Sequence, residues 1–212
     1  MPKFYFYKMT VDDGGAPCVQ NGLLSLAICK PMIRSVASEG DILLGFATNE
    51  LGGDNRLVYA AKVTQKLGGK DYYSGQKYSG RADCIYSWNE GSHVRKVHAK
   101  FHGNLGDLRH DLGQPPDYKR AWVLLSNGLE NFRHFGTGRP EDYKKNNPYL
   151  KSEIESLTQG HRVNHDPALR RELERLGERV FAMPFTAATV PVRASGKKCH
   201  DCSAQDSFTE CA

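Results

Sequence analysis

The order of strand-like and helix-like segments constrains the fold of this chain more than any other feature. Segments rich in apolar, aromatic and β-branched side chains, typical of strands, are residues 3–10, 42–48, 57–64 and 121–126. Apolar residues at helical spacing follow Pro148 and then Pro167, and each proline suits the first turn of a helix. Because strands come first and helices later, the predicted class is α+β.

The segments 42–48 and 57–64 predict a hairpin with a long connection. The residues between them, NELGGDNR, are polar and rich in turn formers. Gly45, inside the first of these strands, indicates a bulge or the close approach of another group. Residues 65–80 are rich in Gly, Lys and Tyr and are expected to form an exposed loop, whereas residues 81–88 are expected to form a short strand.

Length and composition fit an ordinary globular protein. The chain has 212 residues, of which 39% are hydrophobic and 25% are charged, and this excludes a disordered chain. We expect one domain over residues 1–190 and a flexible, Cys-rich tail over residues 191–212. The longest strongly apolar run, residues 23–28, is far shorter than the roughly 20 residues that span a bilayer. No membrane partner and no secretory signal are therefore expected, and the expected location is cytoplasmic, or nuclear in a eukaryote.

Six cysteines are too few, in a core of this size, for a disulfide scaffold, so reduced thiols are expected. Cys199, Cys202 and Cys211 crowd the tail, and the first two have the spacing of a thiolate zinc clamp. Because no second CxxC accompanies them, we favour a terminus with surface thiols and expect no cofactor. Cys18 could act as a nucleophile with a histidine as its base, but nothing around it specifies this.

The net charge of +5 is concentrated in residues 62–120, which hold eleven Lys/Arg and six Asp/Glu. A basic surface of this kind attracts phosphate groups. Tyrosines and Trp88 alternate with the cations, an arrangement suited to single-stranded or flipped bases. The expected contacts to a nucleic-acid backbone are Lys70, Lys77, Arg95 and Lys96. Alternatively, the stretch is a solvated loop, and Tyr86 and Trp88 belong to the core.

Sequence motifs of common enzymes are missing. Gly52-Gly53 has no Lys-Ser/Thr sequel and is not a P-loop, and GxSxG, HExxH and the dinucleotide-binding glycine fingerprint do not occur. Whether the protein is an enzyme is therefore left open.

Several segments resemble known families. The stretch ICKPMIRSVASEGDILLGFATNELGGDNRLVYAAKV resembles the first half of a PUA-like barrel, the group that includes the EVE, YTH and ASCH domains. More closely, FYFYKMTVDDGGAPC, ICKPMIR, RADCIY and VLLSNGLENFRHFG together resemble the nucleotide-modification-associated domain family, second type, over residues 3–185. The resemblance implies a small PUA-like β-barrel with flanking helices and a C-terminal helical pair. It also implies a role in DNA base modification or in the recognition of modified bases.

By this resemblance, a base-binding site would lie between the loop after the first strand, the helix PxxR and the segment RADCIY. Its residues would be Asp13, Cys18, Lys30, Arg34, Arg81, Asp83 and Tyr86. Lys30 and Arg34 would hold phosphate. Asp83 would accept a hydrogen bond from the base edge, and Tyr86 would stack on the base. Alternatively, Arg34 is a surface cation on a helix and Asp83 is a turn or cap residue.

Three hypotheses for the function follow. The leading one is a nucleic-acid-binding protein that recognises a base, in particular a modified base or nucleotide, in a pocket at the barrel mouth. The second is an enzyme that modifies or hydrolyses a nucleotide or nucleobase derivative in the same pocket, with Asp83 or Asp13 as general base. The third is a protein-interaction module whose basic face is incidental.

Overall fold

A computed structural model describes residues 1–138 and 142–185. The boundary at residue 190 and the three cysteines named as a possible zinc site, Cys199, Cys202 and Cys211, lie outside the described residues. The strands are β1 Phe4–Met9, β2 Cys18–Gln20, β3 Leu23–Leu26, β4 Ile42–Ala47, β5 Leu57–Lys62, β6 Gln65–Gly68, β7 Tyr86–Asn89, β8 Ser92–Arg95, β9 Trp122–Asn127, β10 Phe132–His134 and β11 His161–Arg162. The helices are α1 Pro31–Val36, α2 Gly69–Ser74, α3 Leu105–Leu112, α4 Tyr143–Asn146, α5 Pro148–Ser156 and α6 Pro167–Ala182, with short 3-10 turns at Asn49–Leu51 and Gln76–Tyr78.

The largest sheet has the strand order β10-β5-β4-β1-β11, in which β1 and β4 are parallel and the other neighbours are antiparallel. Because successive side chains of a strand point to opposite faces, the run FYFY in β1 supplies two separate cores. Phe4 and Phe6 pack in the cluster that contains the buried faces of α5 and α6. Tyr5 and Tyr7 belong to the cluster on the other face, which also contains Ile33 of α1.

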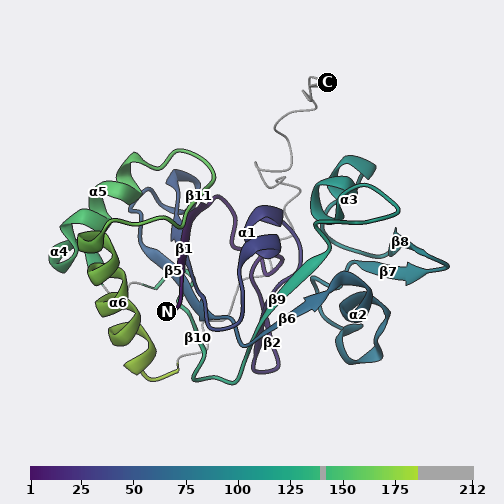
Figure 1. The fold of residues 1–212 in the computed structure, drawn as a ribbon, viewed down its shortest axis with the longest axis horizontal. Coiled ribbons are helices and arrows are strands. Elements are labelled where there is room, and N and C mark those ends of the chain that lie inside the picture. The colour runs from purple at the N-terminus through teal and green to yellow at the C-terminus, as the bar shows by residue number, and fades with distance from the viewer. Residues whose placement is uncertain (139–141, 186–212) are drawn as a thin grey trace.

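A second sheet, β2-β3-β9-β6, and the hairpin β7–β8 form the rest of the β structure. Figure 1 shows α2, α3 and the hairpin gathered at one end of the molecule, opposite α5 and α6. A third, largely aromatic core lies there, and it includes Tyr72, Tyr73, Tyr78 and Tyr86. This third core positions the candidate site described below.

The α+β class is confirmed, and the strands predicted at 3–10, 42–48, 57–64 and 121–126 and the two C-terminal helices are present. Of the strand predicted over residues 81–88, only the part from Tyr86 onward lies in a strand, β7. A PUA-like barrel is not confirmed. Within residues 1–138 and 142–185 the larger sheet ends at β10 and β11 and the smaller one at β2 and β6, and no pairing between strands closes either sheet. In the same part of the chain, no helix combines the length and apolar character needed to cross a bilayer.

The prediction of an exposed loop over residues 65–80 is wrong. This segment forms β6 and α2, and the three tyrosines within it are buried. Tyr72 and Tyr78 stack with ring centroids 4.6 Å apart, and the hydroxyl of Tyr73 donates to the carbonyl of Ala27 over 2.8 Å. Burial of these large rings, with the hydroxyls of Tyr72 and Tyr73 hydrogen-bonded, outweighs the turn preference of the glycines.

The expectation for Gly45 is confirmed. The register between β4 and β5 shifts at Gly45, which marks a bulge. A Cβ atom at this position would collide with the ring of Tyr59 and the sulfur of Met9. The glycine is therefore required by a close approach as well as by the bulge.

Candidate functional site

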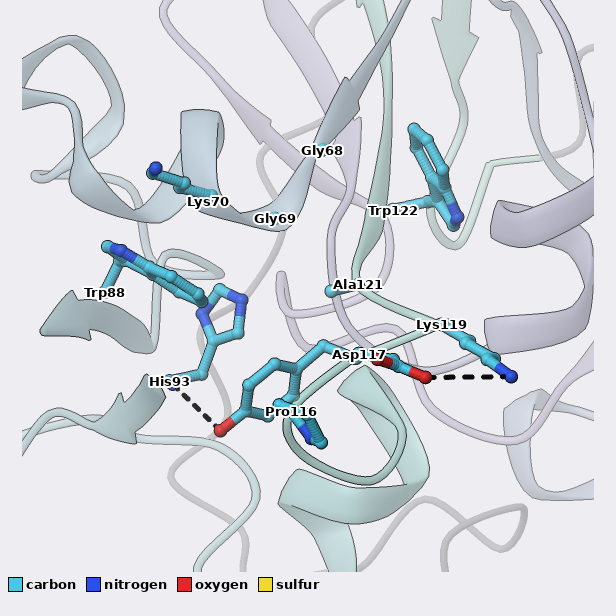
Figure 2. Close-up of a pocket in the computed structure, with 11 residues that line it drawn as sticks. Gly68, Gly69, Lys70, Trp88, His93, Pro116, Asp117, Lys119, Ala121 and Trp122 are labelled. Atoms are coloured by element: carbon cyan, nitrogen blue, oxygen red, sulfur yellow. Dashed lines mark hydrogen bonds and ion pairs between the residues drawn. The ribbon is translucent and has the colours of Figure 1, made fainter. Parts of the chain in front are cut away.

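A cavity of about 440 Å³ lies where the junction of β6 and α2, the β7–β8 hairpin and the loop before β9 meet (Figure 2). Its lining residues are Gly68, Gly69, Lys70, Trp88, His93, Pro116, Asp117, Tyr118, Lys119, Ala121 and Trp122. These residues come from segments up to 54 positions apart in the sequence, so the cavity exists only because the sheet and the third core bring them together.

The hairpin β7–β8 places two rings of the cavity side by side. The connecting residues Glu90 and Gly91 both have positive φ, of 45° and 88°, as a two-residue type I′ turn requires. This turn sets the register in which Trp88 lies directly opposite His93. Their ring centroids are 4.7 Å apart at an interplanar angle of 71°. The turn at Glu90-Gly91 therefore determines that Trp88 and His93 pair across the two strands.

Tyr118 completes an aromatic corner with this pair. Its ring centroid lies 4.7 Å from that of His93 and 6.1 Å from that of Trp88. The backbone N–H of His93 donates to the Tyr118 hydroxyl over 3.2 Å, which holds the loop before β9 against the hairpin. Figure 2 shows Trp88 and His93 of the hairpin side by side in this part of the pocket. We call Trp88, His93 and Tyr118 the aromatic corner.

On the other side of the pocket, Gly69 allows the junction of β6 and α2 to lie close to Ala121 before β9. β6 pairs with β9 in antiparallel register, and the N–H of Gly69 donates to the carbonyl of Ala121. A Cβ atom at position 69 would lie 2.8 Å from the Cβ of Ala121 and 3.3 Å from Cε1 of His93. A side chain at this position would therefore push α2 away from β9 and disturb the pocket.

His93 is the buried titratable group of the pocket. Its side chain is almost fully covered, and burial lowers the pKa of His93 to about 4, so the imidazole is neutral at pH 7. Its Nδ1 is buried and makes no hydrogen bond to any residue that the structure describes. An unpaired buried polar atom of this kind costs free energy of folding.

Three lysines lie at or beside the pocket. Nζ of Lys70 lies 5.6 Å from the centroid of the Trp88 ring, within cation–π range. Lys119 is largely exposed and its Nζ lies 3.8 Å from a carboxylate oxygen of Asp117. On the other side, Nζ of Lys66 lies 4.9 Å over the ring of Trp122. The pocket therefore combines ring faces with two lysines at its own lining and a third beside it.

Arg81 and Asp83, predicted for the base-binding site, lie together in a buried network. Arg81 Nε is 3.5 Å from Asp83 Oδ1, and Asp83 also accepts hydrogen bonds from the hydroxyls of Ser25 (2.5 Å) and Tyr72 (2.8 Å). Burial raises the pKa of the Asp83 carboxyl, although Arg81 and the two hydroxyl donors oppose this shift. Arg81 also donates to the carbonyl of Cys18, whose thiol pKa burial raises to about 12.

Arg34 and Tyr86 meet at a second buried carboxylate, Asp111. The guanidinium of Arg34 is fully buried and donates to the backbone carbonyls of Cys29, Asp111, Arg120 and Trp122. The Tyr86 hydroxyl donates to Asp111 Oδ2 over 2.7 Å. The phosphate-binding role of Arg34 and the stacking role of Tyr86 stay predictions, and the present conformation engages both side chains inside the protein.

The remaining predicted residues lie in different places. Asp13 accepts the N–H of Gly15 in its own turn, and Lys30 Nζ lies 4.8 Å from the ring centroid of Tyr7. Among the predicted backbone contacts, Lys70 lines the pocket and Lys77 lies over the ring of Tyr78. Arg95 donates to carbonyls of the following loop, at Ala99, Phe101 and His102, and Lys96 to the sulfur of Cys84. Their roles in binding stay predictions.

Sequence reasoning missed His93, Tyr118 and Trp122 as pocket residues. A signal for His93 was present, because Glu90-Gly91 between strand-like residues indicates a tight hairpin that pairs Trp88 with His93. Tyr118 and Trp122 carry no local signal, since their position depends on the pairing of β9 with β6. Within the two described ranges, no cluster of three His, Cys, Asp or Glu side chains is arranged to hold a metal ion.

A comparison with family models matches residues 1–189 to Nucleotide modification associated domain 2. The chain belongs to this family, as the motifs in its sequence predicted. Comparison with curated proteins and with solved structures found no match. The family associates the chain with nucleotide modification, and the finer question of what it binds is taken up next.

Proposed function

We propose that the protein binds a nucleobase, as a free nucleotide or within a nucleic-acid strand, in the pocket lined by the aromatic corner. The observation that carries the proposal is the aromatic corner itself, three converging rings with Lys70 over the ring of Trp88. A base has a π face on each side and a phosphate nearby, so it requires rings and cations in this combination. The family's association with nucleotide modification supports the same ligand class.

Size and polarity support a base rather than a larger ligand. A volume of about 440 Å³ is near the lower end of the range for small-molecule pockets, roughly 300–1,000 Å³. His93 is neutral at pH 7, so it adds an uncharged ring to the wall that a base would contact. Lys70 and Lys119 are suited to the phosphate, where their charge acts without strict geometry.

The test uses the tryptophans of the protein as reporters. The chain has two tryptophans, Trp88 and Trp122, and both line the pocket. Deoxynucleoside monophosphates and a short single-stranded oligonucleotide are titrated while tryptophan emission is recorded, with Trp122→Phe isolating the signal of Trp88. Emission should be quenched on binding, since stacking places the base against the indole. Trp88→Ala should weaken binding by about ten- to a hundredfold, because stacking contributes about 1–3 kcal/mol, whereas Trp88→Phe should retain most of it.

Tyr149→Ala is the matched control for Trp88→Ala, since Tyr149 is an exposed aromatic residue on α5.

Lys70→Ala together with Lys119→Ala should flatten the dependence of affinity on salt, whereas Lys151→Ala on α5 should not. If calorimetry detects no binding of nucleotide or strand by the folded protein, or if Trp88→Ala binds as tightly as Tyr149→Ala, the proposal is refuted. Binding of the strand but not of monophosphates would assign the pocket to nucleic acid.

A further inference from the structure

Three polar side chains outside the pocket form a linear relay. Cys29 lies between β3 and α1, His102 lies in the loop before α3, and Asp111 lies near the end of α3. The Sγ of Cys29 is 3.2 Å from Nε2 of His102, and Nδ1 of the same ring is 2.5 Å from Oδ2 of Asp111. A thiol, an imidazole and a carboxylate in this order are the parts of a nucleophilic cysteine site.

The hydrogen bonds determine which ring nitrogen carries the proton. Asp111 presents a carboxylate oxygen to Nδ1 of His102, so Nδ1 must donate. Nε2 then carries the lone pair, and it faces the thiol of Cys29. In this tautomer His102 is placed to take the proton of the thiol, which is the role of the base in such a site.

The carboxylate is held in place by other groups. Asp111 is fully buried, accepts the backbone N–H of Cys29 over 2.7 Å, and accepts the hydroxyl of Tyr86 over 2.7 Å. Nη2 of Arg34 lies 3.6 Å from Oδ1 of Asp111. These contacts orient Asp111 toward the ring and keep the backbone of the nucleophile at a set distance from it. The thiol of Cys29 is buried, like those of Cys18 and Cys84, and the imidazole of His102 is 8% exposed, so the relay comes nearest to the surface at this ring.

The backbone at the relay is strained. Cys29, Lys30 and His102 have φ values of 56°, 44° and 51°, in the left-handed region that favours glycine. Each such residue stores free energy that the surrounding structure must supply, and such residues cluster at functional sites. The turn at Cys29 and Lys30 directs the chain into α1 and brings the thiol to the imidazole of a loop some seventy residues away.

We propose that Cys29 and His102 are the nucleophile and base of a thiol hydrolase or transferase acting on an acyl substrate, an ester or amide, with Asp111 as positioning residue. Nε2 of His102 takes the thiol proton while Sγ forms a bond to the carbonyl carbon. The tetrahedral adduct then expels the alcohol or amine, which receives the proton back from Nε2, and a thioester remains on Cys29. Water, deprotonated by the same nitrogen, attacks the thioester, releases the acid and restores the thiol. This activity is independent of base binding in the pocket.

The first test is the reactivity of individual cysteines toward iodoacetamide, assigned by fragment-ion mass spectrometry. Cys18 and Cys84 are internal references, because burial raises the pKa of both thiols, that of Cys18 to about 12. At pH 6.5 Cys29 should be alkylated at least tenfold faster than Cys84, since transfer of the thiol proton to Nε2 of His102 keeps a thiolate populated. A rate for Cys29 no higher than that for Cys84 in the wild-type protein would overturn the proposal without any substitution.

His102→Asn is the informative variant, because asparagine tolerates a left-handed φ and can still hydrogen-bond to Asp111. It should slow alkylation of Cys29 at least tenfold and move its pH dependence to higher pH. A merely structural role would not change the pH profile of a folded variant. His98→Asn, an exposed histidine in the same loop region, is the matched control and should behave as wild type. If the His102→Asn variant has a native circular dichroism spectrum and the pH dependence of its Cys29 alkylation is unchanged, His102 is not the base.

The second test uses p-nitrophenyl acetate as the acyl probe. Wild type should release about one equivalent of p-nitrophenolate in a burst and carry an acetyl group on Cys29, detected as a mass increase on the intact protein and located on its peptides. Cys29→Ala should lose the burst, and Cys84→Ala should keep it. Absence of a burst and of acetylated Cys29 in the wild-type protein would overturn the acyl-substrate assignment. Nucleotide binding, measured as above, is expected to survive Cys29→Ala, so the two proposals can fail separately.

Discussion

His93 shows how the burial of one side chain couples the stability of the protein to pH. The unfolded side chain titrates near its ordinary value of 6.5, whereas burial lowers the pKa in the folded protein to about 4. Above pH 6.5 both states hold a neutral imidazole, so the contribution to the free energy of unfolding is constant. Between pH 6.5 and 4 the unfolded chain binds a proton that the folded protein excludes, so stability falls as the pH falls.

Wild type should therefore lose more stability than His93→Gln over this range, with a difference of up to about 1.4 kcal/mol per pH unit. The comparison is made by urea denaturation at pH 7, 6, 5 and 4.5. Burial also lowers the pKa of His161 and His165, so these histidines also reduce the free energy of unfolding as the pH falls. Because both proteins contain them, their effect cancels in the comparison. His98→Gln, an exposed histidine, should follow the wild-type profile. Parallel profiles for wild type and His93→Gln would contradict the buried, neutral state of His93.

At the scale of elements, the two C-terminal helices are joined by a carboxylate. Helix α5 begins at Pro148 after Asn147, whose side chain does not cap it. Glu172, buried on α6, instead accepts the N–H groups of Leu150 (2.8 Å) and Tyr149 (3.4 Å). A negative charge at the start of a helix satisfies unpaired donors and interacts favourably with the helix dipole. Helix α6 therefore supplies the N-terminal cap of α5 from outside that helix.

Glu172→Ala should lower the free energy of unfolding by about 2 kcal/mol, because it leaves a buried N–H group without an acceptor. The measurement is denaturant unfolding together with hydrogen exchange of the Leu150 amide, which should lose protection. Glu174→Ala on the same helix removes a half-exposed pair with Arg170 and should change stability by roughly 0.5 kcal/mol or less. Equal effects of the two substitutions would show that Glu172 does not cap α5.

At the scale of the whole molecule, Arg34 links parts of the chain that are distant in sequence. From α1 it donates to the turn at Cys29, to the end of α3 at Asp111, and to the segment that enters β9. A planar guanidinium can serve four carbonyls that diverge in this way, whereas an ammonium group cannot. Arg34 therefore connects α1, which packs in the cluster of Tyr5 and Tyr7, with the third core beside the pocket.

Arg34→Lys should lower the free energy of unfolding by about 3 kcal/mol or more, since several buried carbonyls lose their donors. Thermal and urea unfolding measure the effect, and Arg171→Lys, exposed on α6, serves as the matched control with little change. The same variant also tests the phosphate-binding role predicted from the resemblance. A variant of wild-type stability that loses nucleotide binding would favour that role over the structural one.

The sequence by itself determined the class of the fold and several local features. The alternation in FYFY, the Asp166-Pro167 start of α6, and Gly45 at a bulge all follow from side-chain direction, capping and steric space within a few residues. It also determined the family, whose motifs are contiguous segments of the chain. The clustering of aromatic and basic residues in the stretch that includes Lys70 and Trp88 is also visible in the sequence alone.

Only the tertiary structure decided which of these residues face a ligand. Tyr72, Tyr73, Tyr78 and Tyr86 belong to the same basic stretch as Tyr118 and Trp88, yet the first four are buried away from the pocket, whereas Tyr118 and Trp88 line it. Burial depends on contacts with β3, α3 and β9, which no local pattern records. The relay of Cys29, His102 and Asp111 likewise joins two segments more than seventy residues apart. Hydrogen bonds and packing depend on distances of a few ångströms in space. When the partners are far apart along the chain, their contact produces no periodic pattern that could be recognised in a single sequence.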